Sequence, residues 1–272
     1  MAASVYLRNS LSKGVAVLLN GTGGGAPALD ENADWPTRYT LSPDRYQYWR
    51  ALAGGLGPAA GTYLFDYDYG APVTLAVVGW GMMRQYPQQV EVGNLVLECY
   101  WGSSYPPTNA LGVGLGCTGN DSFAAFTPTA ARYWRVELQA LDGASAPLEV
   151  SGKPWLVEAA DVLALRAPGP ASSSTRVAVE EATATEAGYA HRYRPGVQER
   201  ASVALGERAE HPLDDGVVVA ALGTTLMGLE GRVVLCSYEG DYLEGTLEDG
   251  TAGWERVFNT IYSTAMAVRG TP

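Results

Sequence analysis

The stretch Ala131-Arg132-Tyr133-Trp134-Arg135-Val136-Glu137-Leu138 decides the fold of the first part of the chain. Successive side chains of a β-strand point to opposite faces, so Tyr133, Arg135 and Glu137 share one face. The opposite face, which is large and mostly apolar, holds Arg132, Trp134, Val136 and Leu138. An apolar face of this size needs a core, and the stretch therefore predicts a strand of a packed sheet.

Two further apolar runs lie upstream, Tyr63–Tyr67 and Val73–Trp80, and only Asp68–Pro72 separates them. Together the three runs resemble the discoidin-like, galactose-binding-type jelly roll, in which an "FD-G" strand precedes a "V-AV-G" strand and an "ARYWR-E" strand comes late. The resemblance covers roughly residues 40 to 166. It implies a β-sandwich and leaves function open, because this fold carries sugar binding, lipid binding and scaffolding alike.

Composition narrows the class of protein. The chain has 272 residues, of which 47% are hydrophobic and 17% charged, so it has enough apolar material for a substantial core. The net charge is −11 and no block of basic residues occurs, which argues against a surface that grips phosphate. Three cysteines, at positions 99, 117 and 236, fit neither a disulfide framework nor a zinc pattern.

A change of composition at Ala167–Thr175, which is rich in proline and serine, predicts a linker. We therefore expect a jelly-roll domain over residues 1–168 and a smaller α+β, barrel-like domain over residues 169–272. In the first domain, a helical turn or a short helix is expected over Asp44–Leu52, and Leu148–Val150 and Val162–Leu165 are expected to close the sheet. The second domain is expected to contain, in order, Arg176–Glu180 and Ala201–Leu205 as strands, Asp214–Met227 as a helix, a hairpin of Arg232–Tyr238 with Tyr242–Leu247, and Ile261–Val268 as a final strand.

The candidate chemical motifs are incomplete. Asp30, Asn32 and Asp34 have the spacing that opens a calcium loop, but Trp35 stands where the loop needs glycine, so we expect no required metal. Asp66 and Asp68 could suggest glycoside hydrolysis, but the sequence offers no further acid that would divide the roles. Neither histidine has a metal or nucleophile partner at a recognisable spacing. We therefore expect no enzymatic activity and no cofactor.

Aromatic clusters provide the candidate contact residues. Tyr48 and Trp49 lie in one cluster, and Trp101 and Tyr105 lie in another that leads into a long proline- and glycine-rich loop. Tyrosine and tryptophan are common both in protein interfaces and in cores, and their rings also stack on sugars. Protein contact is favoured over sugar binding at this stage, and both remain open.

The order of elements in the second half, from Leu213 to Val268, follows a discoidin-like half and resembles the small tail proteins of tailed bacteriophages. This resemblance implies a non-enzymatic structural component of a phage-like tail, located in the virion, with other tail proteins and copies of itself as partners. No signal peptide pattern opens the sequence, so synthesis in the host cytoplasm is expected. The alternative is a carbohydrate-binding module for a cell-surface glycan. Under either hypothesis, no specific nucleic acid partner and no membrane insertion are expected.

Overall fold

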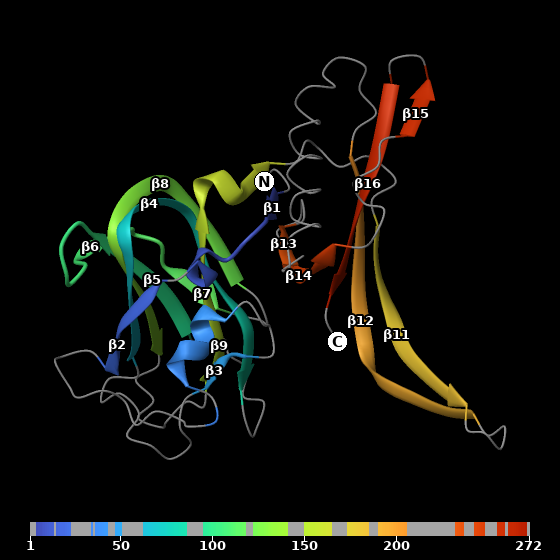
Figure 1. The fold of residues 1–272 in the computed structure, drawn as a ribbon, viewed down its shortest axis with the longest axis horizontal. Coiled ribbons are helices and arrows are strands. Elements are labelled where there is room, and N and C mark those ends of the chain that lie inside the picture. Colours follow the sequence, from blue (N-terminus) through green and yellow to red (C-terminus); the bar gives the residue numbers. More distant parts are fainter. Residues whose placement is uncertain are drawn as a thin grey trace. The chain divides into compact units, whose positions relative to one another are not determined.

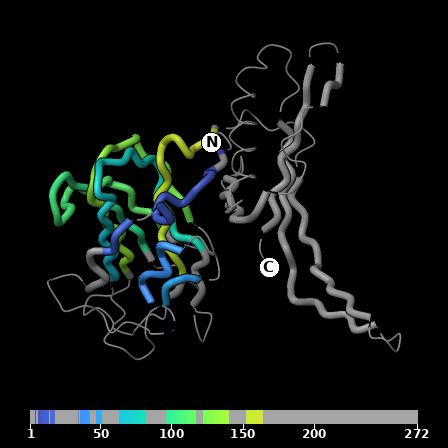
Figure 2. The backbone as a smooth tube through the Cα atoms, in the orientation of Figure 1, coloured from blue at the N-terminus to red at the C-terminus, as the bar shows by residue number. Residues whose placement is uncertain are grey.

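The computed structural model describes residues 4–13, 15–22, 34, 36–42, 47–50, 62–85, 95–117, 122–140, 150–164, 173–184, 190–205, 232–236, 242–247, 255–258 and 261–270. The chain divides into two compact units, Asn9–Asp161 and a second one made of Met1–Arg8 with Val162–Pro272. Figure 1 shows that each unit is built on β-strands, and Figure 2 traces the backbone of both. The prediction of a mainly β protein is confirmed.

The first unit, Asn9–Asp161, is an antiparallel β-structure with short 3₁₀ turns. Its strands follow the order β3-β9-β4-β8-β5-β6, with β2 added to β4 and β7 added to β5. The strands are β2 (Ala16–Thr22), β3 (Trp49–Arg50), β4 (Thr62–Gln85), β5 (Leu95–Gly102), β6 (Asn109–Ala110), β7 (Leu115–Cys117), β8 (Ser122–Ala140) and β9 (Val150–Glu158). The 3₁₀ turns are η1 (Ser10–Ser12), η2 (Thr37–Leu41) and η3 (Ala159–Asp161). This arrangement agrees with the expected jelly roll.

The two runs predicted as separate strands form one long strand, β4, which bends where Asp68–Pro72 interrupts the alternation. The ladder between β4 and β8 shifts register between Asp68 and Val73. Gly70 takes a φ of 74°, a left-handed conformation that suits glycine, and its N–H donates to Asp68 Oδ1 at 2.7 Å. Figure 1 shows β4 and β8 curving together. β4 and β8 stay paired on either side of the bend.

The core is aromatic and lies on one face of β4, β8 and β5. Trp49 is its centre, with edge-to-face contacts to Tyr63 at 5.1 Å, Phe65 at 5.0 Å and Trp80 at 6.2 Å between ring centroids. The predicted core face of the deciding stretch is confirmed for Trp134, Val136 and Leu138, which have no exposed surface.

Arg132 is an exception to the predicted alternation. Its side chain is 40% exposed, pairs with Asp68 and lies over the ring of Tyr133 at 4.8 Å from the centroid. Arg132 lies beside the register shift at which β4 and β8 bend, and a bend breaks the strict two-residue period of a strand. The guanidinium thereby avoids burial in the apolar core.

The second unit contains an antiparallel sheet in the order β10-β1-β13-β14-β16-β12-β11, with β15 beside β16. The strands are β1 (Ser4–Tyr6), β10 (Val162–Ala164), β11 (Ser173–Ala184), β12 (Ala190–Leu205), β13 (Arg232–Cys236), β14 (Tyr242–Leu247), β15 (Glu255–Phe258) and β16 (Ile261–Gly270). The predicted hairpin is present as β13 and β14, and the predicted final strand is β16.

Three expected elements differ from the structure or lie outside the residues that it describes. The strand predicted at Val162–Leu165 exists as β10, but it pairs with β1 and does not close the jelly-roll sheet. Part of the helix predicted near Asp44–Leu52 lies outside the described residues, and Trp49–Arg50 at its end form strand β3. The helix predicted at Asp214–Met227 lies wholly outside them, so the α+β, barrel-like character of the second domain stays a prediction.

A first prediction concerns the core. Replacing Trp134 with Ala removes a fully buried indole and should lower the free energy of unfolding by about 3–5 kcal/mol, because the surrounding core relaxes only partly into the cavity. Urea denaturation followed by circular dichroism measures this change. Tyr105→Ala, which removes a ring of a residue that is 46% exposed, is the control and should change stability far less. An unchanged stability of the Trp134 variant would contradict the core placement.

Candidate binding face

The outer face of the first unit carries the polar side chains that alternate with the core residues of β4, β8 and β5. Strand register places Asp66 opposite Arg135, and Arg135 opposite Tyr100 on the other side. Two residues further along β8, and therefore on the same face, Glu137 lies opposite Glu98 of β5. Three adjacent strands thus present a polar surface, which we call the outer polar face: Asp66, Asp68, Glu98, Tyr100, Arg132, Tyr133, Arg135 and Glu137.

Two ion pairs lie on this face, Arg135–Asp66 and Arg132–Asp68, and the first is the more deeply buried. Arg135 donates to Asp66 through Nε at 2.6 Å and Nη2 at 2.8 Å, and the Asp66 side chain is only 1% exposed. Arg132 makes the same bidentate contact with Asp68, at 2.7 and 2.8 Å, in a more open position. The hydrogen bonds from Arg132 lower the pKa of Asp68, so this carboxylate stays ionised. Both aspartates that suggested hydrolysis are therefore held in ion pairs.

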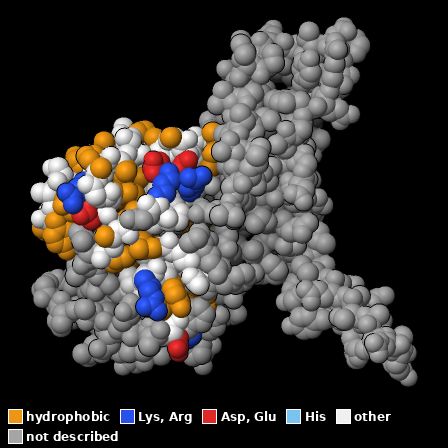
Figure 3. Space-filling model, viewed as in Figure 1, with side chains coloured by type: hydrophobic (Ala, Val, Ile, Leu, Met, Phe, Trp, Pro, Cys, Tyr) orange, Lys and Arg blue, Asp and Glu red, His pale blue; other side chains and the backbone are white. Residues whose placement is uncertain are grey.

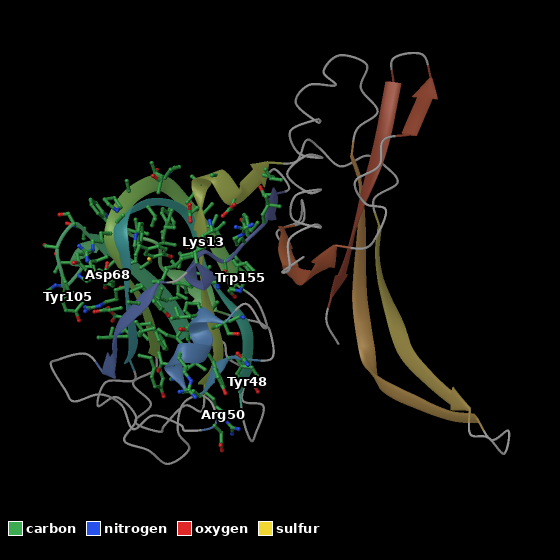
Figure 4. The ribbon with its side chains drawn as sticks, in the orientation of Figure 1. Lys13, Tyr48, Arg50, Asp68, Tyr105 and Trp155 are labelled. Atoms are coloured by element: carbon green, nitrogen blue, oxygen red, sulfur yellow. The ribbon has the colours of Figure 1, made fainter. Side chains whose placement is uncertain are left out.

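Aromatic side chains border the same face. Tyr105 is 46% exposed and its ring lies 5.9 Å from that of Tyr133, between centroids. Burial, the charge of Asp66 and a hydrogen bond to its carboxylate raise the pKa of the Tyr105 phenol. Tyr133 also carries the Arg132 guanidinium over its ring, which is a cation–π contact. Figure 4 shows Tyr105 and Asp68 on the same side of the unit.

Glu98 and Glu137 form a like-charged neighbour pair. Tyr100 donates its hydroxyl to Glu98 Oε2 at 2.6 Å, and this hydrogen bond raises the pKa of Tyr100. Burial and the Glu98 carboxylate raise the pKa of Glu137 above its ordinary value of 4.5, although Arg135 acts in the opposite direction. Charges of equal sign on directly opposed residues destabilise a sheet, so this pair costs folding free energy.

The structure separates the four aromatic residues that the sequence singled out. Tyr105 borders the outer polar face. Trp101 is partly buried and packs against the core, and Trp49 is 2% exposed, so it offers almost no surface to a partner. Tyr48 is half-buried and lies beside Arg50, away from Tyr105 (Figure 4). Of the four, only Tyr105 is an exposed side chain, at 46%, and it lies beside the outer polar face.

Of the polar residues on this face, the sequence singled out Asp66 and Asp68 and missed the others. A signal for Tyr133, Arg135 and Glu137 was present in the deciding stretch, where they alternate with the core residues. What the sequence could not supply is the register that brings Asp66 and Glu98 beside them. Cross-strand neighbours come from distant parts of the chain, and the ladder decides which residues meet.

For the calcium pattern, Asp30 and Asn32 lie outside the described residues, and Asp34 is exposed. In the described part of the chain, no group of three or more His, Cys, Asp or Glu side chains is arranged to hold a metal ion. Among the same residues, no helix has both the length and the apolarity that crossing a bilayer requires.

Side chains of both signs lie close together on the surface of the first unit. In Figure 3, acidic and basic atoms on the visible face lie in small neighbouring groups among hydrophobic ones. One such cluster joins Lys13 to Glu158 at 2.8 Å and to Asp161 at 3.0 Å. Mixed clusters of this kind give no extended field of one sign, and short-range contacts govern recognition there.

Comparison with known proteins gives matches for the fold. No protein-family model matches the sequence, and the search of curated proteins finds no match. Solved structures match about half of the chain. One is the C-terminal domain of a chitobiase from Bacteroides fragilis, with 10% identity and a TM-score of 0.40, covering 53% of this chain and 93% of that one.

Two further matches are binding modules. A chitosan-binding module derived from a chitosanase/glucanase of Paenibacillus sp. IK-5 is 16% identical with a TM-score of 0.33, covering 52% of this chain and 92% of that one. A CBM32 module from Clostridium perfringens, in complex with GalNAc-beta-1,3-galactose, is 8% identical with a TM-score of 0.35, covering 53% of this chain and 93% of that one. Likeness at this level concerns the fold alone.

These comparisons contradict the main functional hypothesis. The chain was expected to be a structural component of a phage-like tail, but the reported matches are a chitobiase domain and carbohydrate-binding modules, and none is a tail protein. The tail hypothesis rested on the order of elements in the second half, and element order recurs among unrelated functions. We therefore abandon it, and the partners expected with it, tail proteins and further copies of the chain, have no support.

A second prediction compares the two ion pairs. Asp66→Asn should lower the free energy of unfolding by about 2–4 kcal/mol, since it leaves a mostly buried guanidinium without its carboxylate. Asp68→Asn should cost much less, because water screens the more exposed pair. Urea denaturation of both variants measures the difference, and equal losses would show that burial does not distinguish the pairs.

A third prediction concerns pH. Because the folded state raises the pKa of Glu137, the contribution of this group to stability falls as pH rises above about 4.5, where the folded protein must give up the more tightly held proton. Glu137→Gln should therefore raise Tm at about pH 7 and leave it nearly unchanged at about pH 4. Calorimetry at both pH values tests this.

The control for the Glu137 variant is Glu158→Gln, which removes a carboxylate paired with Lys13. This change should not raise Tm at neutral pH, although it alters the net charge by the same amount. A similar rise in both variants would attribute the effect to net charge and contradict the local explanation.

Proposed function

We propose that the first unit is a non-enzymatic carbohydrate-binding module that uses the outer polar face. The observation that carries this proposal is the exposed ring of Tyr105, which lies beside Tyr133 at the edge of the charged side chains of this face. A sugar ring has an apolar face of C–H groups and a rim of hydroxyls. An accessible aromatic ring next to ionised hydrogen-bonding groups complements both.

The charged groups suit hydroxyl recognition because their positions are fixed. Arg135 and Asp66 hold each other in a bidentate pair, and Glu98 is fixed by the hydroxyl of Tyr100. Fixed donors and acceptors lose little conformational freedom on binding, and bonds to ionised groups are stronger than neutral ones. The outer polar face is therefore pre-organised for a polar ligand.

A binding role without catalysis also agrees with the aspartates. A glycosidase needs one carboxylic acid to donate a proton and a second carboxylate to act separately. Asp66 and Asp68 instead each accept two hydrogen bonds from an arginine. We propose that these pairs shape the face and do not cleave glycosidic bonds.

A fourth prediction tests the proposal. The purified chain should bind members of a glycan array, and calorimetry with the best ligand should show that Tyr105→Ala weakens binding by about tenfold or more. Tyr48→Ala, which removes an aromatic ring away from the outer polar face, is the matched control and should bind normally. Absence of any glycan binding, or binding unaffected by Tyr105→Ala, would refute the proposal.

A further inference from the structure

One edge of strand β9 is only partly covered by another strand. β9 pairs with β4 along its first edge, whereas on its second edge β3 pairs only with Ser151 and Gly152. In the described part of the chain, no strand lies beside residues 154–156 on that second edge. The run Trp155-Leu156-Val157 is apolar and at most 3% exposed. Open backbone groups on an apolar edge strand are a template onto which another strand can add.

Two side chains take the place of the missing strand. Asn9 Nδ2 donates to the Pro154 carbonyl at 2.9 Å, and Asn9 Oδ1 accepts the Leu156 N–H at 3.2 Å. Ser10 Oγ donates to the Leu156 carbonyl at 2.6 Å. A side-chain amide offers a donor and an acceptor, as a peptide group does. Because proline has no N–H, these bonds satisfy every backbone group that Pro154 and Leu156 turn to this side.

Asn9 and Ser10 are held in place by further contacts. Asn9 Oδ1 also accepts the N–H of Leu11, whose side chain has no exposed surface and belongs to the core. The Tyr69 hydroxyl lies 2.6 Å from Ser10 Oγ. The one hydroxyl hydrogen of Ser10 goes to the Leu156 carbonyl, so Tyr69 is the donor in this contact. Both side chains are therefore fixed against β9.

Two other residues along the same edge also disfavour a further strand. Pro154 cannot donate to a ladder, and proline is typical of strand edges for that reason. Lys13 reaches past the end of β9 to Glu158 at 2.8 Å and to Asp161 at 3.0 Å. A charged side chain at an edge opposes the approach of another sheet. The edge is thus covered by contacts that block strand addition.

We propose that Asn9 and Ser10 form an edge guard, which prevents β9 of one copy from pairing with β9 of a second copy. Two identical strands related by a twofold axis pair antiparallel, so a second copy is the partner that this edge fits without any other component. The guard consists of two side chains, and their removal opens the edge without changing the β9 sequence. This inference is independent of the proposed glycan binding.

The test uses the double variant Asn9→Ala with Ser10→Ala in the full chain. Sedimentation velocity should show its average mass rising toward that of a dimer as concentration increases, relative to the parent chain at the same concentrations. In dilute solution, NMR hydrogen exchange at the Leu156 amide should become about tenfold faster or more. The amides of Trp155 and Val157, which alternate toward β4, should change less. In concentrated solution, the Leu156 amide should regain protection, because a second copy then pairs with it.

The matched control is Ser12→Ala with Asn109→Ala. Ser12 Oγ donates to the Asn9 carbonyl, and Asn109 Nδ2 donates to the Trp101 carbonyl. The control therefore removes one serine and one asparagine, each bonded to a backbone carbonyl, and leaves the edge of β9 covered. It should keep the mass of the parent chain and the slow exchange at Leu156.

Four results would overturn the inference. The Leu156 amide stays protected in the dilute double variant, or that amide exchanges quickly while the mass equals that of the parent at every concentration. The variant associates while Leu156 remains unprotected, which assigns the contact to another surface, or the control associates equally. If the double variant does not fold, Asn9→Ala alone, which frees the Pro154 carbonyl and the Leu156 N–H, decides by the same two measurements.

Discussion

The pairing of β4 with β8 is the constraint on which the rest of the first unit depends. Its register joins Phe65 to Val136 and Tyr67 to Trp134 on the core side, and Asp66 to Arg135 on the outer side. A slip of one residue would exchange the two faces, placing an ion pair in an aromatic core and indoles in water. The core therefore fixes the geometry of the outer polar face, and the same ladder that stabilises the fold positions the groups proposed to bind sugar.

The outer polar face combines stabilising and destabilising contacts. The Asp66–Arg135 pair is nearly buried and bidentate, which favours a single arrangement of both side chains. The opposed pair of Glu98 and Glu137 works against folding. Burial first, and then the Glu98 carboxylate, raise the pKa of Glu137. This unfavourable contact lies within the face proposed to bind sugar.

The bend of β4 has consequences for both the fold and the site. Asp68 caps the turn by accepting the N–H of Gly70, and the same carboxylate accepts both bonds from Arg132. Arg132 in turn covers the ring of Tyr133, which neighbours Tyr105. The contacts of Asp68 at the bend of β4 therefore also hold Arg132 over Tyr133, next to Tyr105.

The sequence by itself determined three strand segments of the first unit and most of the inward face of the last one, with Arg132 as the exception. Alternation over Arg132–Leu138 and in the two upstream runs is a local property, and burial of Trp134, Val136 and Leu138 follows from it. Tertiary structure decided the rest. Only the ladder could show that β10 pairs with β1, that Trp49 is buried while Tyr105 is exposed, and that Glu98 opposes Glu137. Such contacts join residues far apart in the sequence, and no local pattern specifies which of many compatible strands become neighbours.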